Sequence, residues 1–198
     1  LICNEIHPAR AKILSENVER MGIANAMVTN ESPQRLAEVF EDYFTRILVD
    51  APCSGEGMFR KNEAACEEWN PENVSLCAER QDGILDCAAS MLAPGGRIVY
   101  STCTFAPAEN EGSMMRFLLR HPEFRIVEVK KADGMSAGVP EWAYFREKMG
   151  QVLPEIAQTI RLWPQHLNGE GHYLAVLEKE GTLRQGYCRN GEEKGIPA

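Results

Sequence analysis

The 198-residue chain has no apolar run near the roughly 20 residues that a membrane-spanning helix needs, which argues against a membrane protein. Its seven cysteines are an odd number and include no Cys-x-x-Cys pair, and none of its four histidines lies at metal-ligand spacing from a cysteine. A disulfide framework and a zinc site are therefore not expected. Free thiols of this kind indicate no metal and a reducing, cytoplasmic location.

Basic residues are also in the minority, since 21 Lys and Arg stand against 29 Asp and Glu and leave a net charge of -8. A charge of this sign opposes binding to phosphates across the whole surface. Net charge says little about one face, so a nucleic-acid binder of this composition needs a local basic groove or a basic partner domain. Hydrophobic residues at 44% and charged residues at 25% are typical of a soluble globular domain.

Short β-type runs alternate with helical stretches, which predicts an α/β fold with a mainly parallel sheet. We expect strands at residues 1–3, 26–29, 46–49, 97–100 and 124–129, and helices at residues 8–21, 33–40, 74–92 and 111–120. Residues 131–154 are expected to form irregular loops, and residues 159–163 and 172–177 a closing antiparallel strand pair. Residues 1–178 are expected to form one domain, and residues 179–198 a polar tail or a linker to a further domain.

Reactive side chains follow three of the expected strands. Glu5 follows the first strand, Asp50 and Cys53 the third, and Cys103 the fourth. Because ligands collect at the carboxyl ends of strands in open parallel sheets, we expect a carboxylate and two thiols at one rim. Each residue also has a structural interpretation, since free cysteine is often a small core residue, Asp50 can cap a turn, and Glu5 can be a solvated surface acid.

Two longer motifs surround these cysteines. The sequence DAPCSGEG at residues 50–57 resembles the first cysteine motif of the Nol1/Nop2/Sun (NSUN) family of RNA cytosine-5 methyltransferases. The sequence STCTF at residues 101–105, with ENE at residues 109–111, resembles the second, and the order and separation of the two motifs also match. Residues 58–61 and 161–164 are similar to the bacterial, RsmF-like branch that acts on small-subunit ribosomal RNA. The resemblance covers roughly residues 1–178.

This resemblance implies a Rossmann-like class I fold that uses S-adenosylmethionine to methylate C5 of cytosine in RNA. C5 of cytosine is a poor nucleophile, and a thiolate that adds to C6 pushes electron density onto it. The resemblance assigns this attack to Cys103 and assigns to Asp50 a hydrogen bond to the cytosine edge near N3. It assigns to Cys53 the later release stage, when the C5 proton is removed and Cys103 leaves.

The resemblance also implies contacts with the cofactor, at Glu5, Asn30, Asp50 and Pro52, and with RNA, at Arg60 and Lys61. A carboxylate such as Glu5 suits the ribose because it accepts hydrogen bonds from two hydroxyls. After the second strand the family has an Asp where this chain has Asn30. Residues 169–171, Gly-Glu-Gly, resemble a late family motif, for which we favour a tight turn with unusual glycine backbone angles.

Three other functions are compatible with parts of the pattern. A non-catalytic RNA-binding or ribosome-assembly module on the same fold needs neither thiol at the rim. A cysteine hydrolase that used Cys103 needs a histidine to activate it, and none follows at a convincing position. If the chain were a DNA cytosine methyltransferase, the nucleophile would be the cysteine that follows Pro52, which is Cys53, and Cys103 would have no catalytic role.

The family's glycine-rich turn follows its first, central strand and holds part of the cofactor, and no such turn precedes Glu5 in this chain. We therefore expect the chain to lack that strand and an N-terminal segment, and to bind S-adenosylmethionine poorly by itself. Isothermal titration of the chain with S-adenosylmethionine measures this directly. A micromolar dissociation constant would contradict the expectation.

Overall fold

The computed structural model describes residues 1–61, 63–147 and 152–183. Its strands are β1 (Ile2–Asn4), β2 (Met27–Thr29), β3 (Phe44–Asp50), β4 (Leu92–Thr102), β5 (Phe124–Ile126), β6 (Met135–Ala137), β7 (Ile160–Leu162) and β8 (His172–Lys179). Its helices are α1 (Pro8–Arg20), α2 (Pro33–Val39), α3 (Glu63–Glu68), α4 (Pro71–Met91), α5 (Glu111–Arg120) and α6 (Pro140–Glu147), with 3-10 turns at Glu56–Met58 and Pro154–Gln158. In the described residues, no helix combines the length and apolar character that crossing a bilayer requires.

The strands form two sheets, a pair β1–β2 and a larger sheet of order β3-β4-β8-β7-β6 in which β5 also pairs with β8. The expected closing pair is confirmed, because β7 and β8 run antiparallel with Ile160 opposite Leu174. The sheet is more mixed than the sequence pattern predicts: among the described strands, two pairings are parallel and four are antiparallel. Alternating patterns predict that a strand exists but not its direction, and β8 runs against both β4 and β7.

Helix α4 begins earlier than the apolar spacing predicts because of its cap. The side chain of Asn70 accepts a hydrogen bond from Asn73 N–H, and Pro71 occupies the first turn. The expected helix at residues 74–92 therefore starts at Pro71 and ends at Met91. The following residues, 92–96, belong to β4 rather than to a turn.

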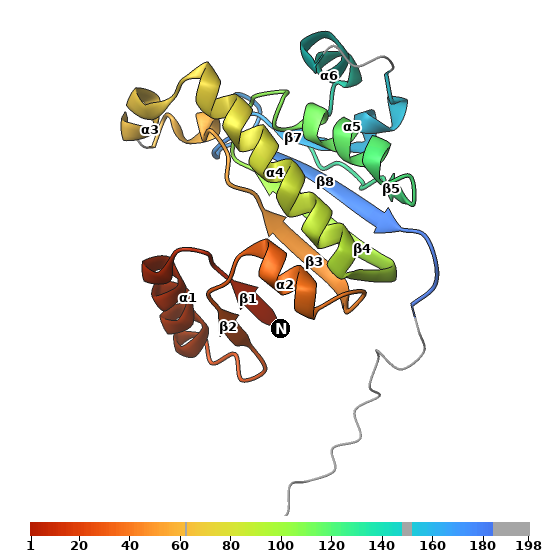
Figure 1. The fold of residues 1–198 in the computed structure, drawn as a ribbon. Helices are drawn as coiled ribbons and strands as arrows, with labels where there is room; N and C mark the ends of the chain where they lie inside the picture. The colour runs from red at the N-terminus through yellow and green to blue at the C-terminus, as the bar shows by residue number, and fades with distance from the viewer. Residues whose placement is uncertain (62, 148–151, 184–198) are drawn as a thin grey trace, which may run out of the picture.

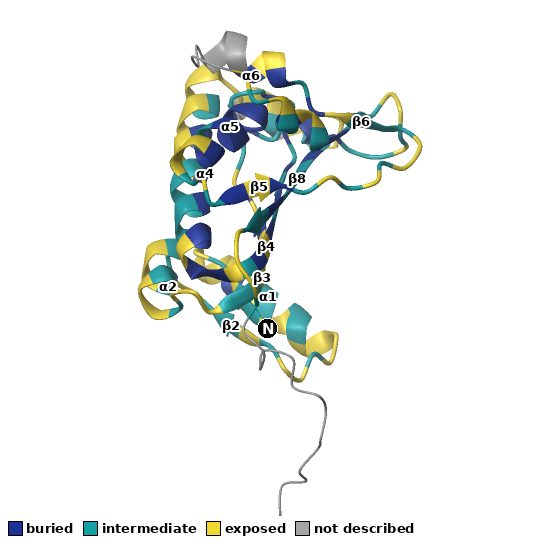
Figure 2. Ribbon diagram, turned by 90° about the vertical axis from the view of Figure 1, so that its right-hand side faces the viewer, coloured by how far each residue is buried: buried dark blue, intermediate teal, exposed yellow. Residues whose placement is uncertain are grey.

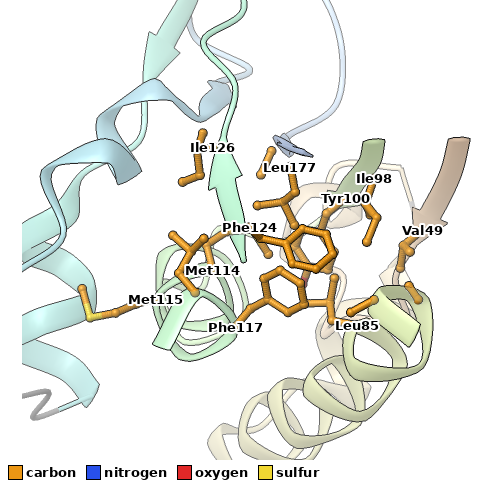
Figure 3. Packing of buried hydrophobic residues seen from close by; sticks show 14 of the residues in the cluster. Val49, Leu85, Ile98, Tyr100, Met114, Met115, Phe117, Phe124, Ile126 and Leu177 are labelled. Atoms are coloured by element: carbon orange, nitrogen blue, oxygen red, sulfur yellow. The ribbon is translucent and has the colours of Figure 1, made fainter. Parts of the chain in front are cut away.

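The main core lies between α4, α5 and the larger sheet (Figures 2 and 3). Leu85 from α4, Phe117 from α5, and Ile98 from β4 are fully buried there, as is Leu177 from β8. Along β4, alternate residues such as Ile98 and Tyr100 face this core, as the period of two in a strand requires. The core fixes β4 against α4 and therefore fixes where β3 and β4 end.

The smaller sheet lies beside β3 rather than within its sheet (Figure 1). Among the described residues, β1 pairs only with β2 and β3 only with β4, so each of β1 and β3 has one edge without a strand partner. Leu48 of β3 is 72% exposed, whereas its neighbour Val49 is 7% exposed against α4. One edge and one face of β3 are thus open in the described structure.

Several short elements lie where the sequence predicts only loops. Residues 131–154 include β6 and α6, and α3 lies in a segment for which no helix is expected. Strand β5 ends at Ile126, three residues short of its expected end at residue 129. The expected tail begins inside β8, which ends at Lys179, and its residues 184–198 lie outside the described residues.

A buried ion pair ties α5 to β7 and supports the segment after β4. The Arg161 guanidinium donates to both carboxylate oxygens of Glu111, at 2.7 and 2.5 Å, and the two side chains are 2% and 0% exposed. Arg161 also donates to the backbone oxygen of Phe105 at 3.2 Å. The guanidinium lies against three aromatic rings, those of Trp142, Trp163 and Tyr173.

Replacing Glu111 by glutamine leaves the Arg161 charge buried without a counter-charge. We expect Glu111→Gln to lower the free energy of unfolding by about 3–5 kcal/mol, measured by denaturant titration. As a control, Glu38→Gln breaks an exposed pair with Arg35 and should cost less than about 1 kcal/mol. Equal, small losses in both variants would show that the buried pair does not hold the fold.

Candidate functional site

The parallel pairing of β3 with β4 sets the position of both cysteine motifs. Asp50 stands opposite Ser101 at the ends of the two strands, and each strand then turns into a loop that carries a cysteine. The Sγ atoms of Cys53 and Cys103 lie 3.3 Å apart, and Cys103 N–H donates to Cys53 Sγ at 3.4 Å. Both cysteines are partly exposed, and Asp50 is exposed. The structure therefore brings the two thiols and the carboxylate to one rim of the sheet.

The two thiols differ in their affinity for a proton. The hydrogen bond with Cys53 lowers the pKa of Cys103 to about 7, against the opposing effects of burial and of the Asp50 charge. The pKa of Cys53 is raised well above its ordinary value, by its hydrogen bond to Cys103 and by burial. Cys103 therefore loses its proton more readily than Cys53 and is partly ionised near neutral pH, whereas Cys53 keeps its proton.

A hollow of about 530 Å³ lies between the end of β1 and the end of β3. Its lining residues are Asn4, Glu5, Arg10, Ile13, Leu14, Asn17 and Asp50. The Glu5 carboxylate accepts from His7 N–H at 2.9 Å and pairs with Arg10 at 2.8 Å, and the Arg10 side chain is 69% exposed and so free to turn outward. The size of the hollow and the carboxylate on its wall fit the ribose part of a nucleoside cofactor.

Two expected cofactor contacts are not among the residues that line this hollow. The Asn30 amide donates to the backbone oxygen of Glu5 at 2.6 Å and so joins the ends of β2 and β1. Pro52 is exposed, and its backbone oxygen accepts from Gln81 of α4 at 2.9 Å. In this structure, both residues hold the rim in place.

The expected RNA contacts Arg60 and Lys61 are exposed and follow the 3-10 turn at Glu56–Met58. Arg60 donates to the backbone oxygen of Gly169 at 3.2 Å and lies 3.8 Å from the Glu170 carboxylate. Arg60 therefore stands at the edge of the loop before β8.

A buried carboxylate joins the two cysteine loops. Glu109 accepts hydrogen bonds from the backbone N–H and the hydroxyl of Ser54, which follows Cys53, and from the Gln81 amide. Burial raises the pKa of Glu109. The motif at residues 109–111 thus has a structural role. Gln81 is fully buried in the middle of α4, and no pattern in the sequence indicated its contact with Glu109.

Two glycines allow the loops to touch. Gly57 N–H donates to the backbone oxygen of Cys103 at 2.9 Å, and a Cβ on Gly57 would stand 2.8 Å from that oxygen. Gly171 packs against the Phe105 ring, where a Cβ would clash, and its φ is not positive. The expected turn with unusual backbone angles at residues 169–171 is therefore wrong, because it is close approach rather than φ that requires glycine at Gly171.

Within the described residues, no group of three or more His, Cys, Asp or Glu side chains is placed to hold a metal ion. The groups that the structure gathers at this rim are the thiol pair, Asp50 and the neighbouring hollow.

Comparison with known proteins decides the family. Residues 1–178 match the model of the family described as 16S rRNA methyltransferase RsmB/F. The chain belongs to this RsmB/F family.

Relatives of this RsmB/F chain are longer than it is. Ribosomal RNA small subunit methyltransferase F of Shewanella denitrificans is 31% identical in an alignment of 199 positions that covers 100% of this chain and 36% of the relative. The protein of the same name from Aeromonas salmonicida is 32% identical in an alignment of 203 positions that covers 100% of this chain and 39% of the relative. The crystal structure of PH0851 superimposes with a TM-score of 0.76 at 28% identity, over 90% of this chain and 36% of that one. The chain therefore spans well under half of each, and the α/β methyltransferase fold is confirmed.

Alkylation of Cys103 in this RsmB/F chain should follow its lowered pKa. Since the thiolate is the reactive form, the rate of Cys103 modification by iodoacetamide should rise with pH around a midpoint of about 7. In Cys53→Ala the donor is lost, and the midpoint should move up toward the ordinary value of 9.0. Peptide mass spectrometry separates Cys103 from the other cysteines.

The matched controls are Cys53→Ser, which keeps a hydrogen-bond donor, and Cys87→Ala, which removes a thiol on α4. Cys53→Ser should stay closer to the wild-type midpoint than Cys53→Ala, and Cys87→Ala should not move it. If the midpoint is the same in Cys53→Ala and in wild type, the thiol pair does not set the pKa of Cys103.

Proposed function

We propose that this chain carries the catalytic site of an S-adenosylmethionine-dependent methyltransferase that modifies C5 of cytosine in small-subunit ribosomal RNA. One observation carries the proposal: two thiols 3.3 Å apart, of which Cys103 has the lowered pKa, lie at the rim that Asp50 shares. Membership of the RsmB/F family and the names of the two relatives support RNA of the small subunit as the substrate.

Cys103 is the proposed nucleophile. Its thiolate adds to C6 of cytosine, while Asp50 hydrogen-bonds the edge of the ring near N3 and orients it. S-adenosylmethionine supplies the methyl group that C5 receives. The buried Glu109 and Gly57 hold the loop of Cys103 against that of Cys53, so the nucleophile is positioned before RNA binds.

Cys53 is proposed to act at the release stage, and its environment supports this order. Its high pKa results first from the hydrogen bond to Cys103. When the sulfur of Cys103 is bonded to C6 it no longer carries charge, so this cause disappears and the pKa of Cys53 falls. Cys53 then loses its own proton to solvent and, as a thiolate, takes the C5 proton. The electron pair of the C5–H bond forms the C5–C6 double bond, and Cys103 leaves C6 as a thiolate.

The hollow lined by Glu5 and Asp50 is the proposed cofactor site. Glu5 would hold the ribose hydroxyls once Arg10 turns away. Asp50 lines this hollow and also acts electrostatically on Cys103, so the hollow adjoins the thiol pair. Arg60 and Lys61 are proposed to contact RNA phosphates, because both are exposed cations next to the first cysteine loop.

We also propose that a further strand pairs with the open edges of β1 and β3 in the complete enzyme. Both edges belong to parallel pairs, and the small sheet lies beside β3 in Figure 1. One strand between them would join the two sheets and complete the wall of the cofactor hollow. This agrees with the weak cofactor binding expected of the chain alone.

Substitution of each cysteine tests the order of the two thiols. In the full-length protein, Cys53→Ala should accumulate a covalent complex with 16S ribosomal RNA in the presence of S-adenosylmethionine, because release fails after attack. Cys103→Ala should form no such complex and should lose methyl transfer. Denaturing gels and mass spectrometry of the trapped RNA measure both and identify the cytosine.

The control Cys87→Ala should turn over normally and trap no RNA, because its thiol lies on α4 outside the site. If Cys103→Ala traps RNA and Cys53→Ala does not, the two roles are reversed. A wild-type protein that binds the RNA but transfers no methyl group would favour the alternative, a non-catalytic RNA-binding or ribosome-assembly module.

A further inference from the structure

A second hollow, of about 250 Å³, opens beside Cys53 on the side of α3 and α4. Its lining residues are Cys53, Ser54, Gly55, Met58, Ala65, Trp69 and Asn73. It is smaller than the roughly 300–1,000 Å³ of sites for drug-sized ligands, so its size suits a single planar group. Neither Cys103 nor Asp50 lines it.

Trp69 forms an aromatic wall of this hollow and is held there by an edge contact. Its indole Nε1–H donates to Glu56 Oε1 at 3.0 Å. The other oxygen of Glu56 accepts from Phe105 N–H at 3.0 Å, in the loop that carries Cys103. Glu56 therefore fixes the orientation of the Trp69 ring relative to the nucleophile's own loop, while 37% of Trp69 remains exposed.

A ring held by its edge and open to solvent is a prepared stacking surface. An ordinary surface tryptophan would lose side-chain freedom on binding, but the hydrogen bond to Glu56 has already restricted Trp69. Aromatic side chains of this kind bind the unstacked bases of single-stranded RNA. The Asn73 amide on the same hollow can exchange hydrogen bonds with the edge of a base.

We propose that Trp69 stacks on the base next to the target cytosine in the RNA strand, and that the hollow beside Cys53 takes that base. This inference rests on the proposed function, which places the target ring between Cys103 and Asp50. Cys53 lines the hollow and also belongs to the proposed catalytic site, but Cys103 and Asp50, which would bind the target cytosine, do not line the hollow. The hollow would therefore bind the neighbouring base. When the target cytosine leaves the base stack to react, the neighbouring base loses a stacking contact, and the Trp69 ring replaces that contact.

The test uses the full-length protein and a single-stranded RNA with one cytosine between two adenosines, intact or with either adenosine replaced by an abasic nucleotide. Binding is measured by fluorescence anisotropy, and methyl transfer by kcat/KM. The variants are Trp69→Leu, which removes the ring, and Trp69→Phe, which keeps a stacking face but loses the bond to Glu56. Leu76→Ala, at an exposed apolar position of α4 outside the hollow, is the control.

Trp69→Leu should weaken binding of the intact RNA by roughly 5- to 150-fold, the range that corresponds to stacking on one base. Wild type should bind one of the two abasic RNAs as weakly as Trp69→Leu binds the intact RNA. On that abasic RNA, Trp69→Leu should have an affinity only slightly below that of wild type, since both changes remove the same contact. Trp69→Phe should keep most of the affinity, and Leu76→Ala all of it. Thermal unfolding identifies any variant that fails to fold.

The inference would be overturned if Trp69→Leu bound the intact RNA with the affinity of wild type. It would also be overturned if, at both abasic positions, the loss of affinity from Trp69→Leu multiplied the loss from the abasic nucleotide. A loss in Trp69→Phe as large as that in Trp69→Leu would also count against stacking and assign Trp69 to the support of Glu56. If wild type transfers no methyl group to any RNA, the proposed function fails, while the binding measurements still decide the role of Trp69.

Discussion

The candidate site depends on the parallel pairing of β3 with β4. These strands end together, with Asp50 opposite Ser101, and each continues directly into a cysteine loop. Two cysteines 50 residues apart in the chain therefore meet with their sulfurs 3.3 Å apart. If one of the two strands slipped by one residue, its side chains would turn to the other face and the carboxylate would be separated from the thiols. The core between α4 and the sheet keeps this register in place.

Three acids, of which Glu109 and Glu111 are buried and Glu56 is partly buried, then hold the two loops together. Glu109 is bonded to Ser54 and Glu56 to the backbone of Phe105, both in loops beyond the strand ends. Glu111 pairs with Arg161 of β7, which in turn donates to the backbone oxygen of Phe105. Because these acids have hydrogen-bonded or charged partners, their burial is tolerated.

The sequence predicted the fold class and most strands and helices, because apolar periodicity depends on local burial. It did not predict β6, α6 or α3, since short elements in segments rich in Gly, Pro and charge show too few turns of a pattern. It also overestimated the parallel character of the sheet. The direction of β8 depends on which neighbours it joins, and the residues of β8 carry no record of that choice.

The sequence by itself determined the family motifs and the chemistry of their side chains: a strand-end carboxylate at Asp50 and thiols at Cys53 and Cys103. Only the tertiary structure decided which thiol keeps its proton, because that depends on the hydrogen bond between two sulfurs and on their burial. It likewise decided that Asn30 and Pro52 support the rim, that Gly171 is needed for close packing, and that Trp69 stands beside Cys53. Contacts between residues far apart in the chain leave no periodic signal, and these roles consist of such contacts.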